Sequence, residues 1–278
     1  MGIKKVLIFG GTHGNEWTGI YLIKKYSSLL KNEFKNLDLN FIHANPEAFV
    51  LNKRFKDEDL NRAFEFVEEK RPHSYENLRA KEIKSLILEE ECFVIDLHTT
   101  TSNLGSTLIV TQDHPLNFIL SSGVRDSKII HSPDPEKKYL VSQSQTGVMI
   151  EVGPVAQGVL SAQVLHETLR ILRELFTQIS VKKPTQKTLE VYEEVEDVYY
   201  PQSAGSLDGY IHEGFQGRDF QEISGDYTPF RLFSGEEVKK QTQEILYPIF
   251  INEAAYYSSK LAFTMCRKKI LNLDASQN

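Results

Sequence analysis

His13 and Glu16 place an imidazole and a carboxylate three residues apart, a spacing that suits a metal ion. The apolar run 6–9 before them predicts a buried strand, and apolar residues at helical spacing follow from Trp17. The glycines at 10–11 can adopt the positive φ of a tight turn between the two elements. Catalytic zinc sites use three such protein ligands and one open position. A single short motif is not specific, so a further ligand must come from elsewhere in the chain.

Two more polar side chains end predicted strands: His98 follows the apolar run 92–97, and Glu151 follows 148–150. In open α/β sheets, sites form at the carboxyl ends of strands, where the strand order reverses. Taken singly, His98 could be a core histidine and Glu151 a solvated loop residue. Together with His13 they indicate a metal site at one edge of a sheet.

The composition is that of an ordinary globular protein, with 40% hydrophobic and 25% charged residues among 278. A chain of this length can bury a large core, most simply in two domains. The net charge of −6 argues against a nucleic-acid-binding surface. No apolar run approaches the roughly 20 residues that cross a bilayer, and the first residues do not predict a signal peptide.

The number of cysteines indicates the cellular compartment in which the protein is expected. The chain has only 2 cysteines, which suits a reducing environment better than a disulfide framework. We therefore expect a cytoplasmic protein with neither nucleic acid nor membrane as a partner. The sequence leaves homo-oligomerisation open.

Strands and helices are predicted to alternate along the first part of the chain. Strands are expected at 5–9, 39–43, 92–97, 107–110 and 147–150, helices at about 16–30, 75–88 and 161–179, and irregular structure at 45–61. Such alternation predicts an α/β fold with a mainly parallel sheet flanked by helices.

The pattern changes near residue 185. Residues 189–195 alternate with period two, and short segments punctuated by glycine and aspartate follow as far as Leu232. This predicts a smaller, mostly antiparallel β-rich domain. We expect a catalytic domain at 1–185 and the β-rich domain at 186–278. The segment 252–269 is expected to be helical and to pack back on the first domain.

Several segments, in chain order, resemble the aspartoacylase family. They are Gly-Gly-Thr-His-Gly-Asn-Glu at 10–16, Asp-Leu-Asn-Arg at 59–62, Asp-Leu-His-Thr-Thr-Thr-Ser-Asn at 96–103, Glu-Val-Gly-Pro with Gln-Gly-Val-Leu at 151–160, and Phe-Ile-Asn-Glu-Ala-Ala-Tyr-Tyr at 250–257. The match runs from residue 5 to about 260. The family is related to succinylglutamate desuccinylases and shares the zinc-carboxypeptidase fold. The resemblance therefore implies a zinc-carboxypeptidase-like first domain and a C-terminal domain that narrows the entrance to the active site.

The resemblance also implies a catalytic centre. It implies one zinc ion per protomer, held by His13, Glu16 and His98, and it implies Glu151 as the residue that activates water. Zinc makes a nucleophilic water available near neutral pH, and a carboxylate can carry its proton to the leaving amine. Asp96, two residues before His98, is either an acceptor for a ligand imidazole or a structural carboxylate at the end of a strand.

Substrate-binding residues follow from the same resemblance. It implies Arg54 as the donor that stabilises the oxyanion, and Asn61, Arg62 and Tyr256 as the groups that hold the substrate α-carboxylate. The forked donors of arginine suit both tasks. The charged stretch 53–62 would otherwise be a solvated loop.

One position departs from the family pattern. Family members that deacetylate N-acetylaspartate carry an arginine ten residues before the catalytic glutamate, and here that residue is Val141. Lys137, Lys138 or Lys260 could supply the missing charge, although lysine is not a bidentate fork. We therefore expect hydrolysis of the amide bond of a small N-acyl amino acid, N-acetylaspartate-like, with a weaker preference for an acidic side chain.

Two other functions stay open at this point. A zinc carboxypeptidase acting on peptides would share the metal ligands and the arginines, but the domain after residue 185 would obstruct a long peptide. A non-catalytic zinc-binding protein on the same scaffold would not need Glu151.

Overall fold

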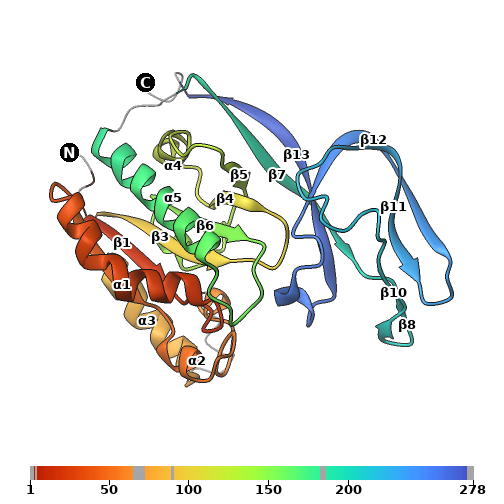
Figure 1. Ribbon diagram of the computed structural model, residues 1–278, viewed down its shortest axis with the longest axis horizontal. Coiled ribbons are helices and arrows are strands. Elements are labelled where there is room, and N and C mark those ends of the chain that lie inside the picture. Colours follow the sequence, from red (N-terminus) through yellow and green to blue (C-terminus); the bar gives the residue numbers. More distant parts are fainter. Residues whose placement is uncertain (1–2, 4, 65–72, 89–90, 182–185, 274–278) are drawn as a thin grey trace.

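The computed structural model describes residue 3 and residues 5–64, 73–88, 91–181 and 186–273. Its dominant feature is an 11-stranded sheet in the order β10-β11-β12-β13-β7-β5-β4-β6-β3-β1-β2 (Figure 1). Its strands are β1 (Lys5–Gly10), β2 (Asp38–His43), β3 (Cys92–Thr99), β4 (Gly105–Val110), β5 (Lys128–His131), β6 (Gly147–Gly153), β7 (Thr188–Tyr199), β10 (Gly209–Ile211), β11 (Ile223–Leu232), β12 (Glu237–Ile249) and β13 (Leu261–Asn272). β8 (Gln202–Ser203) and β9 (Ser206–Leu207) form a separate small ribbon.

Helices cover both faces of the first part of this sheet. The described helices are α1 (Trp17–Glu33), α2 (Pro46–Val50), α3 (Tyr75–Leu88), α4 (Pro115–Ser121) and α5 (Ala162–Val181), with the 3₁₀ helices η1 (Leu60–Arg62), η2 (Val141–Gln143) and η3 (Ala254–Tyr256). Alternate residues of β1 show the two layers: Val6 and Ile8 join the core beneath α1 and α5, whereas Leu7 and Phe9 join the core beneath α3. A strand buried on both faces is apolar throughout, as the run 6–9 is. No described helix is both long and apolar enough to cross a membrane.

The strand directions confirm the predicted fold class. β2, β1, β3 and β6 are neighbours in the sheet and pair in parallel. β4 is antiparallel to β6 but parallel to β5. The carboxyl ends of β1, β3 and β6 therefore meet at one edge of the sheet, which is where the candidate residues were predicted.

The C-terminal part continues the sheet rather than forming a separate one. β7 pairs in parallel with β5 on one side and antiparallel with β13 on the other. β12, β11 and β10 extend it as antiparallel neighbours. Aromatic side chains such as Phe215, Phe230 and Phe263 fill a core of their own there. In Figure 1 the long β7 and β13 strands cross from the helix-covered part into this β-rich part.

The helix expected at 252–269 is wrong. Only Ala254–Tyr256 is helical, as a single 3₁₀ turn, and Leu261–Asn272 is strand β13. Residues 262–266 are all buried, so the run lacks the period-two alternation that marks a half-buried strand. Its conformation depends on pairing with β7, a contact between residues far apart in sequence.

Three short elements lie where no regular structure was predicted. α2 occupies part of the segment expected to be irregular, and α4 and β5 lie between two predicted strands. Both helices carry a recognisable start: Asn45 and His114 cap the backbone, and a proline follows each of them. Proline at the first helical position is a known start signal, so capping could have revealed α2 and α4.

Two glycines bring the candidate ligands into place through close packing. A Cβ on Gly10 would lie 2.7 Å from the backbone carbon of Gly19, so this pair allows α1 to approach the end of β1. A Cβ on Gly14 would lie 2.1 Å from the backbone carbon of Ala48 in α2. The glycine beside His13 is therefore required by the contact between the turn and α2.

Candidate active site

The three predicted metal ligands meet at the carboxyl ends of β1 and β3. His13 lies in the turn after β1, Glu16 directly precedes α1, and His98 lies near the end of β3. β1 and β3 are paired so that Gly10 lies opposite Leu97, which brings the turn beside His98. Each of the three side chains is buried.

Their ligand atoms converge. His13 Nδ1 lies 2.6 Å from Glu16 Oε1, and His98 Nδ1 lies 3.0 Å from Glu16 Oε2. One ligand atom from each residue fits within 4.8 Å of the others. Ligands of a tetrahedral zinc ion lie about 2.1 Å from the metal and hence about 3.4 Å apart. The donor set and its spacing therefore fit a divalent cation such as zinc.

The electrostatics of this cluster also favour a cation. Burial raises the pKa of Glu16, but the charges and hydrogen bonds of His13 and His98 lower it below the usual value overall. Burial lowers the pKa of His98, but Asp96 and Glu16 raise it well above the usual value overall. The cluster thus holds an ionised carboxylate and attracts positive charge, and a metal ion would replace the proton on such a ligand.

Each imidazole has a second carboxylate partner on its other nitrogen. His98 Nε2 lies 2.8 Å from Asp96 Oδ2, and His13 Nε2 lies 3.1 Å from Asp59 Oδ1. Such contacts orient a ligand ring and select its tautomer. Of the two possibilities for Asp96, the structure favours the contact with the imidazole. Asp59 was not singled out from the sequence, although it begins the Asp-Leu-Asn-Arg segment and caps η1.

We expect Asp96→Asn to weaken zinc binding by about 10- to 100-fold, because the ring of His98 would lose its anionic partner. The affinity can be measured by competition with a chelator of known strength. Asp219→Asn changes a buried aspartate in the β-rich part and should leave the zinc affinity unchanged. An unchanged affinity in Asp96→Asn would show that this contact does not support the metal site.

Glu151 lies beside the cluster, on the neighbouring strand β6. In the parallel pairing of β3 with β6 it is the residue opposite His98. Its Oε2 atom is buried and bonds to none of the described residues. Burial raises the pKa of this carboxyl well above its usual value, with His98 opposing and Glu16 adding to the shift. A buried, unpaired polar atom is costly in a purely structural role, so it indicates a functional site.

Arg54 is held toward the same cluster. Its Nε and Nη2 atoms each lie 3.0 Å from Asp59 Oδ2, and its Nη1 lies 3.6 Å from Glu16 Oε1. The backbone carbonyl of Arg54 accepts a hydrogen bond of 3.1 Å from Gly14 N. The loop that carries Arg54 is therefore fixed to the turn that carries His13.

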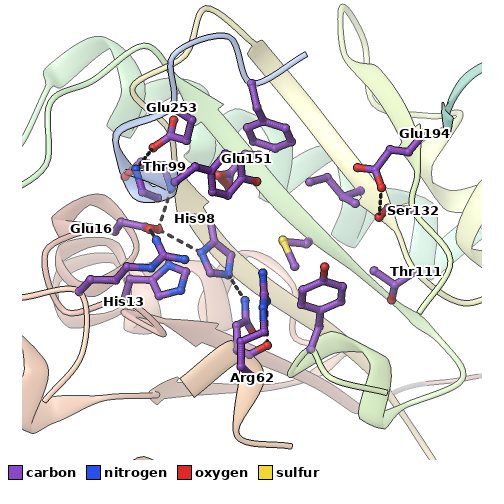
Figure 2. Close-up of a pocket in the computed structure, with 18 residues that line it drawn as sticks. His13, Glu16, Arg62, His98, Thr99, Thr111, Ser132, Glu151, Glu194 and Glu253 are labelled. Carbon is purple, nitrogen blue, oxygen red and sulfur yellow. Dashed lines mark hydrogen bonds and ion pairs between the residues drawn. The ribbon is translucent and has the colours of Figure 1, made fainter. Parts of the chain in front are cut away.

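The three residues predicted to hold a carboxylate line the same pocket. The Asn61 side chain lies 3.4 Å from His98 Nε2 and accepts a hydrogen bond from Leu140 N. Arg62 stacks on the ring of Tyr139 at 4.8 Å and donates to the Asn61 carbonyl. Tyr256 reaches the pocket from η3. All eight residues predicted for the site thus share one cavity (Figure 2), and their individual roles stay predictions.

Glu253 contributes a contact that was not predicted. Its Oε2 accepts hydrogen bonds from Thr101 N at 2.8 Å, from Ser102 Oγ at 3.1 Å and from the Thr100 hydroxyl. The segment before η3 is thereby attached to the loop that follows β3. The Thr-Thr-Thr-Ser run thus has two uses: Thr99 lines the pocket, and the next three residues bind Glu253.

The predicted substitutes for the missing arginine lie elsewhere. Val141 is 1% exposed and packs in the core, so position 141 does not face the pocket. No lysine is among the described residues that line it. Lys260 instead donates to Gln202 and to the carbonyl of Gly205.

The mainly parallel, helix-covered part of the sheet, with a His-Glu-His cluster at its carboxyl edge, defines an α/β protein with a candidate metal-dependent site. Residues 2–179 match the family model of the succinylglutamate desuccinylase/aspartoacylase catalytic domain. Residues 187–268 match that of the AstE/AspA barrel-sandwich hybrid domain. The chain belongs to the succinylglutamate desuccinylase/aspartoacylase family.

Similar proteins span the same length. A probable aspartoacylase of Trichodesmium erythraeum is 35% identical and aligns over 98% of this chain and 99% of its own. The N-acyl-aromatic-L-amino acid amidohydrolase (carboxylate-forming) of Homo sapiens is 33% identical over 96% of this chain and 91% of its own. The crystal structure of murine aminoacylase 3 superposes with a TM-score of 0.89 at 29% identity, covering 98% of both chains.

Proposed function

We propose that this protein hydrolyses the amide bond of a small N-acyl amino acid and releases a carboxylate and the free amino acid. The observation that carries the proposal is the buried Oε2 of Glu151, which lies beside the His13, Glu16 and His98 cluster and has no hydrogen-bond partner in the described part of the chain. Relatives that are named as aspartoacylases or N-acyl amino acid amidohydrolases support the reaction class.

Zinc is the proposed cofactor, held by His13, Glu16 and His98. A zinc ion in this position would act as a Lewis acid and make water more acidic. Glu151 accepts a proton from the water that attacks the amide carbon and passes it to the leaving nitrogen. Arg54 donates to the carbonyl oxygen as negative charge develops on it. The C–N bond breaks as the hydroxyl of water bonds to the acyl carbon and its proton passes to the nitrogen. The products are one carboxylic acid and one amine.

The substrate α-carboxylate is proposed to bind Asn61, Arg62 and Tyr256. Arg62 is suited to this task because its guanidinium is already oriented by stacking on Tyr139. Its exposed side chain also leaves donors free for a ligand, as its one described hydrogen bond uses Nη1.

The C-terminal part of the chain lines one side of the pocket, which favours a small substrate over a peptide. Phe250, Glu253 and Tyr256 all line the pocket from the segment between β12 and β13. Glu253 also fixes this segment to the loop after β3. A long peptide chain leaving the site would meet this segment. We further propose a cytoplasmic location, because the two cysteines are buried and form no disulfide with each other.

The proposed α-carboxylate site predicts a large difference between N-acetyl amino acids and their C-terminal amides. A charged hydrogen bond contributes about 1.5–3 kcal/mol. Loss of the carboxylate should therefore lower kcat/KM by roughly 10- to 150-fold, since each 1.36 kcal/mol is tenfold. Arg62→Gln should lower kcat/KM for the acids while changing the rate for the amides little.

A second series of substrates distinguishes a hydrolase of small N-acyl amino acids from a carboxypeptidase that acts on peptides. N-acetyl amino acids are compared with blocked peptides of three to six residues that share the same C-terminal residue. The proposal requires that efficiency falls as the acyl side lengthens. Equal efficiency along the series would instead identify a carboxypeptidase.

A further inference from the structure

The pocket has an acidic end away from the His13 and Glu16 side. Glu194 of β7, Ser132 after β5 and Thr111 after β4 form this end (Figure 2). Ser132 Oγ donates to Glu194 Oε2 at 2.6 Å. Because β7 pairs with both β5 and β13, the position of Glu194 is fixed by strands on either side.

The carboxylate of Glu194 has no cationic partner among the described residues. The pKa of Glu194 is raised overall, because the surrounding protein reduces the hydration of the carboxylate and outweighs the Ser132 hydrogen bond, which lowers the pKa; Asp197 adds to the increase. Neither arginine of the pocket forms an ion pair with Glu194 among the described residues: Arg54 pairs with Asp59, and Arg62 stacks on the ring of Tyr139. Glu194 nevertheless remains exposed to solvent within the pocket, so a ligand can reach it.

This end of the pocket is unsuited to an acidic group. A ligand carboxylate placed there would meet the like charge of Glu194. With Val141 in the core, no arginine is available at that position to offset the repulsion. An ammonium, guanidinium or amide group would instead donate to Glu194.

We infer that Glu194 determines specificity, selecting N-acyl amino acids whose far end carries a hydrogen-bond donor, preferably a cation, and disfavouring acidic ones. The inference rests on the proposed function, because it takes the ligand of this pocket to be an N-acyl amino acid. The donor can belong to the amino-acid side chain or to the acyl group, since either could extend from the reacting amide to Glu194.

Two pairs of isosteric substrates test the inference and separate these sources. Nα-acetyl-L-ornithine and N-acetyl-L-norleucine differ only in a terminal ammonium or methyl on the side chain. N-(4-aminobutanoyl)-L-norleucine and N-pentanoyl-L-norleucine differ in the same way on the acyl group. We expect the cationic member of one pair to be preferred in kcat/KM by about 10-fold, the lower end for a charged hydrogen bond, because water also reaches Glu194. N-acetyl-L-glutamate should be the poorest substrate.

Glu194→Gln should bring the preferred pair close to parity, since the amide keeps the shape and removes the charge. Glu193→Gln is the matched control: Glu193 is next in the same strand, pairs with Lys269 at 2.9 Å and does not line the pocket. That variant should keep the preference. A wild-type protein that prefers the neutral member of both pairs, or a Glu194→Gln variant that keeps the preference, would overturn the inference.

Binding measurements test the selectivity of Glu194 independently of whether the protein hydrolyses the amide bond. Calorimetry on the Glu151→Gln background, with and without Glu194→Gln, gives the dissociation constants of the same four compounds. A cationic preference in binding without turnover in the wild type would support the role of Glu194 and contradict the proposed hydrolysis. Turnover without that preference would contradict the role of Glu194 alone.

Discussion

Glu151→Gln is expected to lower kcat by about 10² to 10⁴, the usual contribution of general acid–base catalysis, while zinc content and substrate affinity stay near their wild-type values. Glutamine has almost the shape of glutamate but cannot accept the proton of the attacking water. Glu151 Oε2 has no hydrogen-bond partner among the described residues, so the substitution should break no structural contact.

The measurement is single-turnover kinetics together with elemental analysis of the same sample. Glu193→Gln is the control, because it makes the same chemical change on β7, where Glu193 pairs with Lys269 and does not line the pocket. Its kcat should stay close to that of the wild type. A near-normal kcat in Glu151→Gln would remove Glu151 from the mechanism.

His13→Ala and His98→Ala are expected to abolish zinc binding and activity together. Each removes one of the three proposed ligands, all of them buried, and Glu16 with the one remaining histidine cannot complete a catalytic zinc site. The double substitution should contain no zinc after dialysis against metal-free buffer, as measured by elemental analysis.

His166→Ala provides the control for loss of a histidine, because His166 is exposed on α5 and outside the pocket. It should retain one zinc ion per chain and full activity. Full zinc occupancy in the His13→Ala, His98→Ala double variant would refute this ligand assignment.

The edge of the sheet that carries the site could be predicted because it depends on local patterns. Apolar runs of strand length ended at His98 and Glu151, and parallel strands bring their carboxyl ends together. The structure refines this picture, since both residues lie inside their strands rather than beyond them. Direct pairing of His98 with Glu151 brings the proposed metal ligand and the proposed base together.

The remaining parts of the site depend on contacts between residues far apart in sequence. Glu253 reaches the loop after β3 across 152 positions, and Glu194 enters the pocket because β7 pairs with β5. Because a helix was wrongly expected at 252–269, the contact of Glu253 with the loop after β3 was not predicted. No short motif marks such residues, so Glu194 and Glu253 could not be identified from spacing alone. The division of the chain at residue 185 stays a prediction.

Zinc titration of the metal-free protein tests whether it is a zinc-dependent N-acyl amino acid hydrolase. The protein is stripped with a chelator, zinc is added in known amounts, and release of the free amino acid from N-acetyl-L-norleucine and Nα-acetyl-L-ornithine is followed by NMR. Activity should rise with zinc up to one equivalent per chain, with carboxylate and amino acid formed in equal amounts. Tight binding of one zinc ion without hydrolysis of any N-acyl amino acid, or full hydrolysis in the metal-free protein, would contradict this proposal.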